Sequence, residues 1–258
     1  MASSEKDALV HALEHHELTS ALQRGPQYKS CLAQELDVSS KTVYRRAHKL
    51  IESGLVKRCQ NGYRLSNLGQ LYCNLISELW NISGNISEIK PLLRDASLQK
   101  YPPYWFFAEI RTVCATEETP LRPIEELEAV FKNAEKLHGL LPVVASRFVK
   151  LLRRRVEASE LSLELIVKSA AIDKLRQRDD EGDGMLMRDA QLWQIESVPY
   201  GLIIVIEPKP SVFLVMHNEN GMVTGIIENQ NPVATTWALQ KFDQYLTDAT
   251  SANWQLPA

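Results

Sequence analysis

The sequence predicts an α+β protein with an N-terminal winged helix-turn-helix, a connecting helix and a C-terminal α/β domain. Three helical segments and a β-favouring hairpin follow one another near the N-terminus, and this order is far more specific than any single element. Apolar residues then recur at helical spacing, and in the second half strand-like and helix-like segments alternate. We expect the three domains to span residues 1–66, 67–100 and 101–258.

Two helices are expected in the first 36 residues. The first runs from Asp7 to Gln23, where apolar residues recur at roughly helical spacing, and the breaker pair Gly25-Pro26 ends it. The second covers Lys29 to Leu36, with its apolar residues on one side. A tight connection at residues 37–39 then leads into the next helix.

The third helix is predicted from Ser40 to Ser53. Ser39 precedes it as an N-cap, and Gly54 follows it as a C-terminal stop. Its buried face is expected to consist of Val43, Ala47, Leu50 and Ile51.

A basic hairpin is expected directly after this helix. Two short β-favouring runs, Leu55 to Cys59 and Tyr63 to Leu65, flank the dipeptide Asn61-Gly62. Both turn residues tolerate positive φ, so this dipeptide favours a two-residue hairpin turn. The hairpin would be the wing.

A long helix is predicted from Asn67 to about Leu93, because apolar residues recur at steps of three and four. Pro91 indicates a kink or break near Lys90. The apolar seam could pair two subunits or pack onto the chain's own domains, and we favour the pairing. The residues expected to form the dimer contact are Leu75, Leu79, Ile82, Ile86 and Ile89.

The second half of the chain predicts an α/β domain with a substantially parallel sheet. An exposed loop is expected at 178–184, a hairpin at 212–227, and a final helix from Pro232 to about Asp248, capped by Asn231. The predicted strands are 110–115, 137–141, 161–167, 192–195, 202–206, 212–217 and 222–227. The other predicted helices are 123–135, 145–158 and 169–178.

Charge is distributed unevenly along the chain. Residues 29–64 contain eight basic and three acidic side chains, a net charge of +5, whereas the rest of the chain is at −8. A basic module attached to an acidic remainder is typical of a protein that neutralises DNA phosphates on one surface only. A solvated basic face without a partner is the alternative.

The predicted third helix and hairpin supply the candidate contacts to double-stranded DNA. Arginine, lysine and hydroxyl side chains can contact base edges or phosphates when a helix enters the major groove, and wing residues can reach an adjacent minor groove. We expect base contacts from Lys41, Thr42, Arg45 and Tyr44, and phosphate contacts from Arg46 and Lys49. The full candidate set is Ser40, Lys41, Thr42, Tyr44, Arg45, Arg46, Lys49, Lys57, Arg58 and Arg64.

The second half offers no catalytic set, so we do not expect an enzyme and assign no catalytic residue. It contains no Gly-x-Ser-x-Gly elbow, no glycine-rich phosphate loop and no His-Glu-x-x-His motif. Its two histidines are His138 and His217, and His217 is interpreted as a turn residue rather than a base.

No metal or cofactor is expected either. His11 and His15 are spaced i, i+4 around Glu14 and could clamp a metal, but an exposed helix face explains them better. The four cysteines form no Cys-x-x-Cys pair, which indicates reduced thiols. With no signal peptide and no apolar run of transmembrane length, we expect a cytoplasmic protein without a membrane partner.

The chain resembles a family of archaeal winged helix-turn-helix transcriptional regulators that carry the C-terminal domain of the methanogenesis regulatory protein type. In the first half the resemblance rests on LAQELDVSSKTVYRRAHKLIESGLVKR and NGYRLSNLG. In the second half it rests on residues 140–144, 198–202 and 212–227 and on NPVATTWALQKFDQYL, with Trp237 and Phe242 to Tyr245 in the closing helix.

The resemblance implies a sequence-specific regulator whose C-terminal domain is an effector or oligomerisation module, similar to non-catalytic relatives of the phospholipase D fold. Hydrolases of that group use a His-x-Lys motif, and no histidine here is followed two residues later by lysine. Many salt-adapted members are strongly acidic, whereas this chain balances 32 acidic against 29 basic residues.

Three hypotheses follow. The leading one is a dimeric transcription factor whose C-terminal domain responds to a small-molecule effector or a partner. The second is an architectural, chromatin-associated DNA-binding protein with a purely structural C-terminal domain. The third, a phosphodiester hydrolase that regulates its own expression, is remote.

Overall fold

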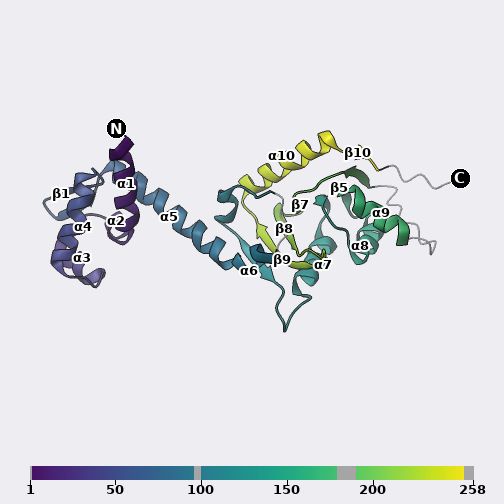
Figure 1. Cartoon of the computed structure of the whole chain (residues 1–258), viewed down its shortest axis with the longest axis horizontal. Helices are drawn as coiled ribbons and strands as arrows, with labels where there is room; N and C mark the ends of the chain where they lie inside the picture. The colour runs from purple at the N-terminus through teal and green to yellow at the C-terminus, as the bar shows by residue number, and fades with distance from the viewer. Residues whose placement is uncertain (1, 96–99, 179–189, 253–258) are drawn as a thin grey trace. The chain divides into compact units, whose positions relative to one another are not determined.

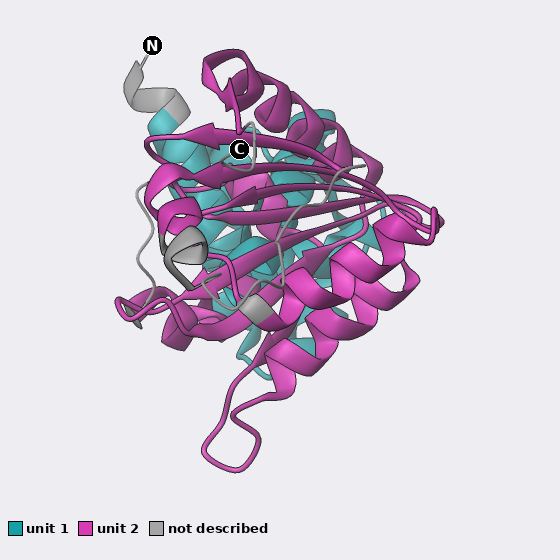
Figure 2. Ribbon diagram, turned by 90° about the vertical axis from the view of Figure 1, so that its right-hand side faces the viewer, with its two compact units in different colours: residues 1–84 teal, residues 85–258 magenta. Residues whose placement is uncertain are grey.

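The computed structural model describes residues 2–95, 100–178 and 190–252. The chain divides into two compact units, residues 1–84 and 85–258, which Figure 2 colours separately. The boundary falls within the segment predicted as the connecting helix. Most of the predicted loop at 178–184 lies outside the described residues.

Unit 1 consists of helices followed by a two-stranded hairpin, in the order predicted for a winged helix-turn-helix (Figure 1). Its core gathers apolar side chains from every one of these elements, including Leu18, Leu32, Val43, Leu55 and Ile76. The elements are α1 (Ala2–Glu14), α2 (His16–Gln23), α3 (Lys29–Glu35), α4 (Ser40–Glu52), β1 (Val56–Cys59) and β2 (Gly62–Leu65), after which α5 (Asn67–Glu88) begins.

The prediction of one first helix from Asp7 to Gln23 is wrong, because the chain turns at His15 and forms two helices. His15 has φ −123° and ψ 28°, outside the helical region, while α2 places Leu18 and Leu22 in the core. Neither glycine nor proline marks the turn, so the sequence carries no local signal for it.

The prediction of the third helix is confirmed by α4 and its N-cap. The Ser39 side chain accepts a hydrogen bond from the Thr42 backbone N–H at 3.1 Å, as an N-cap does. Val43, Ala47 and Leu50 are fully buried, whereas Ile51 is only partly buried. The helix therefore holds one apolar face in the core and presents the opposite face to solvent.

The predicted hairpin is confirmed, but its turn residues are Gln60 and Asn61, because Gly62 already pairs with Cys59 as the first residue of β2. β1 pairs antiparallel with β2, and the backbones of Gln27 and Tyr63 exchange two hydrogen bonds of 2.9 Å. Gly62 has φ +103°, and a Cβ built on it would lie 2.2 Å from the Gln27 carbonyl oxygen. Glycine is therefore required here for both conformation and space.

The end of α4, the hairpin and the start of α5 meet at one small network of polar contacts, which we call the Leu55 junction. The Leu55 N–H donates to Leu50 and the Ser66 N–H donates to Leu55. The Ser66 hydroxyl donates to Gly54 at 2.6 Å and accepts from the Gly69 N–H at 2.9 Å. A Cβ on Gly69 would lie 1.9 Å from the Leu55 oxygen, so the first turn of α5 touches the Leu55 backbone directly.

Unit 2 is built on an eight-stranded sheet with helices on both faces (Figures 1 and 2). The strand order is β10-β6-β5-β4-β7-β8-β9-β3. The strands are β3 (Arg111–Cys114), β4 (Lys136–Leu141), β5 (Ser162–Lys168), β6 (Gln191–Ile195), β7 (Gly201–Glu207), β8 (Ser211–His217), β9 (Val223–Asn229) and β10 (Thr250–Ser251). The helices are α6 (Lys90–Asp95), the 3₁₀ turn η1 (Tyr104–Phe107), α7 (Arg122–Asn133), α8 (Ser146–Glu157), α9 (Ser169–Arg178) and α10 (Pro232–Asp248).

The prediction of a substantially parallel sheet is only partly right. β4, β5 and β6 are parallel, but β7, β8 and β9 form an antiparallel meander, and β3 and β10 pair antiparallel at the two edges. Short hairpin connections within the meander reverse the chain at each step, whereas helices connect β4 to β5 and β5 to β6.

The long helix ends at Glu88 and α6 starts at Lys90, so the break that Pro91 indicated near Lys90 is confirmed. Two further elements of unit 2 were not predicted. The segment after Pro103 forms η1, which buries Phe106 and Phe107. β10 adds a two-residue edge strand beside β6.

Alternate residues of the central strands enter the two faces of the sheet. Ile203 and Val215 belong to the core cluster shared with α7 and α8, whereas Phe242 of α10 packs over His138 on the other face. The central strands are accordingly almost continuous apolar runs, as expected for a sheet covered on both sides.

The Leu55 junction predicts opposite effects for two glycines of α5. Gly69→Ala should destabilise unit 1 strongly, because its methyl group would clash with the Leu55 carbonyl. Gly84→Ala has open space and a helical backbone, so it should be neutral or stabilise by about 0.4–1 kcal/mol. Thermal unfolding followed by circular dichroism tests both. Equal melting temperatures for the two variants would contradict this account of the junction.

Candidate nucleic-acid interface

The solvent-facing side of α4 presents a basic and aromatic surface. Lys41, Tyr44 and Arg45 are exposed, and His48 lies one turn further along with its ring centroid 5.9 Å from that of Tyr44. At the start of the helix Ser40 is exposed and the Thr42 hydroxyl lies 2.9 Å from that of the Ser39 cap. Five of the predicted contacts therefore lie at or beside one exposed face.

Arg46 and Lys49 occupy the flank of α4 that faces α1 and α2. Arg46 lies 3.4 Å from Glu17, and Lys49 lies 3.6 Å from Glu14. Both cations thus have an acidic partner in their own chain. The structure brings them close to the predicted surface but leaves them with less unbalanced charge than Lys41 and Arg45.

The hairpin holds the other predicted cations in two positions. Lys57 and Arg64 are directly opposite each other across the strands, and both are exposed. Arg58 is on the other side of the hairpin, where its guanidinium carbon lies 6.0 Å from the Tyr44 ring centroid. Arg58 therefore connects the hairpin to the exposed face of α4.

Of the seven cations predicted to contact DNA, five have no ion-pair partner among the described residues: Lys41, Arg45, Lys57, Arg58 and Arg64. We call them, together with Tyr44, the basic surface. Like charges directly opposite in a sheet repel and destabilise it. The Lys57–Arg64 pair therefore favours an anion beside it, and a row of such cations matches a phosphate backbone.

Sequence reasoning missed two side chains beside the basic surface. Tyr28 is 54% exposed, and its hydroxyl donates to the Asn61 side chain in the hairpin turn. His48 is adjacent to Tyr44 and 3.3 Å from Glu52. The i, i+4 spacing from Tyr44 could have identified His48, but nothing local in the sequence places Tyr28 at the turn.

The predicted dimer residues on the long helix fall into two groups. Leu75, Leu79 and Ile86 are exposed, and the exposed stripe also includes Leu68 and Leu71. Ile82 and Ile89 are buried within the chain, with Ile89 fully inaccessible. These two side chains are therefore unavailable to a second subunit, whereas Leu75, Leu79 and Ile86 are accessible to solvent.

The histidines of unit 1 are engaged in contacts within the chain. His11 lies 2.6 Å from the Ser53 hydroxyl, and the His15 ring is largely buried, which lowers its pKa. Glu14 lies near Lys49. Throughout the described ranges, no group of three metal-ligating side chains gathers here or in unit 2.

In unit 2, His138 lies on the α10 side of the sheet, 3.6 Å from Glu164, which also accepts a hydrogen bond from Trp193. Burial lowers the pKa of His138. His217 ends β8 on the opposite face, as residue alternation requires. The structure thus separates the two histidines of this unit. No described helix is long and apolar enough to cross a membrane.

Charge repulsion across the hairpin predicts that Lys57→Gln stabilises the chain when nucleic acid is absent. The expected gain is about 0.2–1 kcal/mol at low ionic strength, and it should vanish in 1 M salt because exposed charges are screened. Lys57→Arg keeps the charge and serves as the control, with no gain expected. A gain that persists in 1 M salt would show that repulsion is not its cause.

Two family models match the chain, and their limits follow the two units. HVO_A0261 N-terminal domain matches residues 3–83. Methanogenesis regulatory protein FilR1, middle domain, matches residues 120–248, which is half of the chain. No protein of curated function matches the sequence.

Solved structures also match. TrmBL2, an archaeal chromatin protein with a novel mode of DNA binding, matches with a TM-score of 0.40 and 12% identity, covering 91% of this chain and 92% of its own. Nuc from Salmonella typhimurium, a phospholipase D family member, has a TM-score of 0.41 and 11% identity, over 56% of this chain and 98% of its own. NucT from Helicobacter pylori has a TM-score of 0.41 and 9% identity, over 55% and 99%.

All the segments quoted for the resemblance in the second half lie within the matched range, residues 120–248. Because this family model spans α7 to α10, it covers the whole described sheet of unit 2 apart from β3 and β10. The chain therefore belongs to the family of the methanogenesis regulatory protein FilR1, middle domain.

Proposed function

We propose that this chain is a sequence-specific, duplex-DNA-binding transcriptional regulator that acts as a homodimer, with unit 2 in a sensory and non-catalytic role. The observation that supports it most is the basic surface, where five cations without acidic partners gather on α4 and the hairpin. Membership in a family named for a regulatory protein agrees with this role.

The proposed contacts divide by position on the basic surface. Lys41, Tyr44 and Arg45 are on the exposed face of a capped helix, as base-reading side chains of a recognition helix are. Lys57 and Arg64 on the hairpin are suited to phosphates, because exposed lysine and arginine can neutralise the backbone without reading sequence. Arg46 and Lys49 contribute less, since Glu17 and Glu14 already balance them.

A dimer suits such a protein, because two winged helices can bind two half-sites about one helical turn apart, roughly 34 Å. The exposed stripe on α5 offers the contact. Leu71 and Leu75 are 68% and 47% exposed, and Leu79 follows one turn later. An apolar row of this kind costs free energy in water and is a candidate subunit interface.

The non-catalytic role of unit 2 agrees with the absence of a His-x-Lys motif from the sequence. His138 is held beneath α10 by Glu164 and Phe242, rather than at an open site. Hydrolysis of a phosphodiester substrate by the purified chain, lost on His138→Ala substitution, would contradict this part of the proposal.

Arg45→Ala tests the DNA contact. Against duplexes selected by the wild-type chain from a random library, its affinity should fall about 5- to 150-fold with relaxed sequence preference, the loss expected for a base-contacting arginine. Lys57→Ala should weaken binding to all duplexes alike. It should also reduce the steepness of the plot of log K against log salt concentration by about one.

Arg154→Ala is the matched control for Arg45→Ala, because Arg154 is an exposed arginine on α8 of unit 2. Its affinity for the same duplexes should equal that of the wild type in a fluorescence-anisotropy titration. Unchanged binding by Arg45→Ala, or an equal loss in Arg154→Ala, would overturn the proposed interface.

The dimer is tested by the double variant Leu75→Glu, Leu79→Glu. Two carboxylates in the apolar stripe should convert a dimeric chain into a monomer in sedimentation equilibrium, since unpaired charges are not tolerated in an apolar interface. Leu121→Glu changes a leucine of unit 2 that is 52% exposed and should leave the dimer intact. A wild-type chain that stays monomeric at all concentrations would contradict the proposal.

A further inference from the structure

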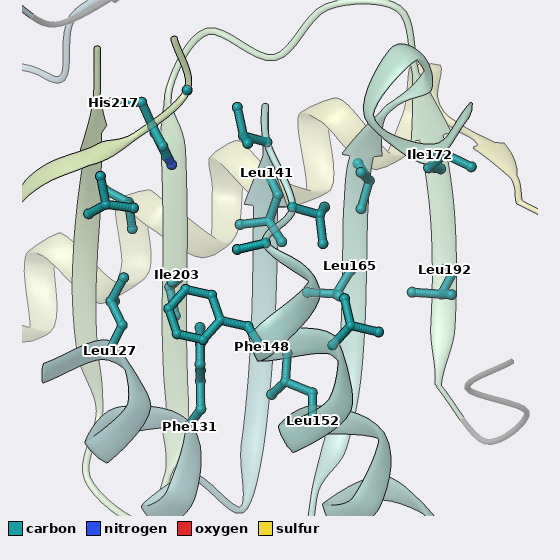
Figure 3. Close-up of a pocket in the computed structure, with 18 residues that line it drawn as sticks. Leu127, Phe131, Leu141, Phe148, Leu152, Leu165, Ile172, Leu192, Ile203 and His217 are labelled. Atoms are coloured by element: carbon teal, nitrogen blue, oxygen red, sulfur yellow. The ribbon is translucent and has the colours of Figure 1, made fainter. Parts of the chain in front are cut away.

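Unit 2 contains a pocket between its sheet and the helices α7, α8 and α9, with a volume of about 90 Å³. Figure 3 shows the side chains that converge on it. Ile203 and Leu165 of the sheet form its floor, Phe131 comes from α7, and Phe148 comes from α8. An apolar cavity of roughly 150 Å³ can hold a benzene ring, so a ligand of this size would fill the pocket and extend into its opening.

The pocket lies at the carboxyl ends of the parallel strands. Leu141 is the last residue of β4, Val167 is near the end of β5, and both line the pocket. Open α/β sheets bind ligands outside the carboxyl ends of their parallel strands. Here the parallel strands are β4, β5 and β6, and Leu141 and Val167 place the pocket at their carboxyl edge.

One polar side chain, His217, lines a pocket whose other described side chains are aliphatic or aromatic. Figure 3 shows His217 at the upper end, with its ring directed toward the pocket. Gly201 allows this orientation, because a Cβ there would lie 3.1 Å from the His217 ring. A register shift between β8 and β9 at Met216 and His217 pairs His217 with Val223, which also lines the pocket.

The environment of His217 defines what it can bind. Burial lowers its pKa to about 4, although a hydrogen bond with the Val215 backbone opposes that shift, so the ring is neutral at neutral pH. A neutral imidazole that donates one hydrogen bond has its other nitrogen available as an acceptor. The described side chains that line the pocket include no lysine or arginine, so none of them would balance a carboxylate or phosphate.

We infer that this pocket binds a small, uncharged and largely apolar molecule that carries one hydroxyl or N–H donor, with His217 as the acceptor. The apolar walls would enclose the body of the molecule, and the histidine would fix its orientation. Val143, 36% exposed and next to Gly221 in the β8–β9 turn, lies at the opening. Binding is independent of the proposed function, whereas a role of the ligand as effector depends on it.

Phenol and toluene are suitable probes, because they have nearly the same shape and only phenol has a donor. With the full chain and no DNA present, phenol at about ten times its Kd should raise the melting temperature by roughly 3 to 6 °C. Toluene should bind more weakly, and benzoate should give no shift. Isothermal titration calorimetry gives the Kd values directly.

Two variants locate the site. His217→Leu should weaken phenol binding roughly two- to tenfold and leave toluene unchanged, whereas His217→Gln, which retains an acceptor, should recover part of the loss. Val143→Trp should close the opening and abolish binding of both probes. Val233→Trp, at an exposed valine of α10, is the control and should bind like the wild type.

Circular dichroism of each variant without ligand checks that it is folded before binding is compared. No binding of phenol by the wild-type chain in calorimetry would overturn the inference, as would equal binding by Val143→Trp. Equal affinities for phenol and toluene would overturn the role of His217. Since no DNA is present, none of these failures affects the proposed DNA contact.

Discussion

The close approach of Gly69 to the Leu55 backbone holds the functional part of unit 1 together. At the Leu55 junction, hydrogen bonds through Ser66 connect the end of α4 to the hairpin and to the first turn of α5. A side chain larger than hydrogen at residue 69 would separate them. The junction therefore fixes the hairpin cations relative to the exposed face of α4, and it attaches the helix that bears the proposed dimer stripe to the same frame. The proposed DNA contacts and the proposed dimer contact would therefore be connected through the Leu55 junction.

The two units use charge in opposite ways. In unit 1 the cations that face the helices, Arg46 and Lys49, are balanced by acids, while those on the outer surface are not. The repulsion between Lys57 and Arg64 is a cost that an anionic partner would relieve. In unit 2 none of the described side chains that line the pocket is a lysine, arginine, aspartate or glutamate, and burial keeps His217 neutral. Electrostatics would thus favour binding of a phosphate backbone to unit 1 and of a small uncharged molecule to unit 2.

Local signals in the sequence predicted the parts of the structure that depend on neighbouring residues. Ser39 as a cap, the buried face of α4 and the hairpin each rest on a few consecutive residues, and all are present, although the turn lies at Gln60 and Asn61 rather than at Asn61-Gly62. The turn at His15 was not predicted, because no glycine or proline lies near it in the sequence. The antiparallel meander and the burial of Ile82 and Ile89 depend on distant pairing and packing, which spacing does not encode. The pocket was not predicted, since its lining comes from nine helices and strands and from loops far apart in the chain.

The salt dependence of duplex binding tests the central claim, that the basic surface binds the DNA backbone. Each neutralised phosphate contributes a slope of about −0.9 to the plot of log K against log salt concentration. The two proposed phosphate contacts, Lys57 and Arg64, should therefore contribute about −1.8 to the slope per protomer, and the slope should become shallower by about that amount when both are changed to glutamine. A slope near zero, or one that these substitutions leave unchanged, would contradict the account.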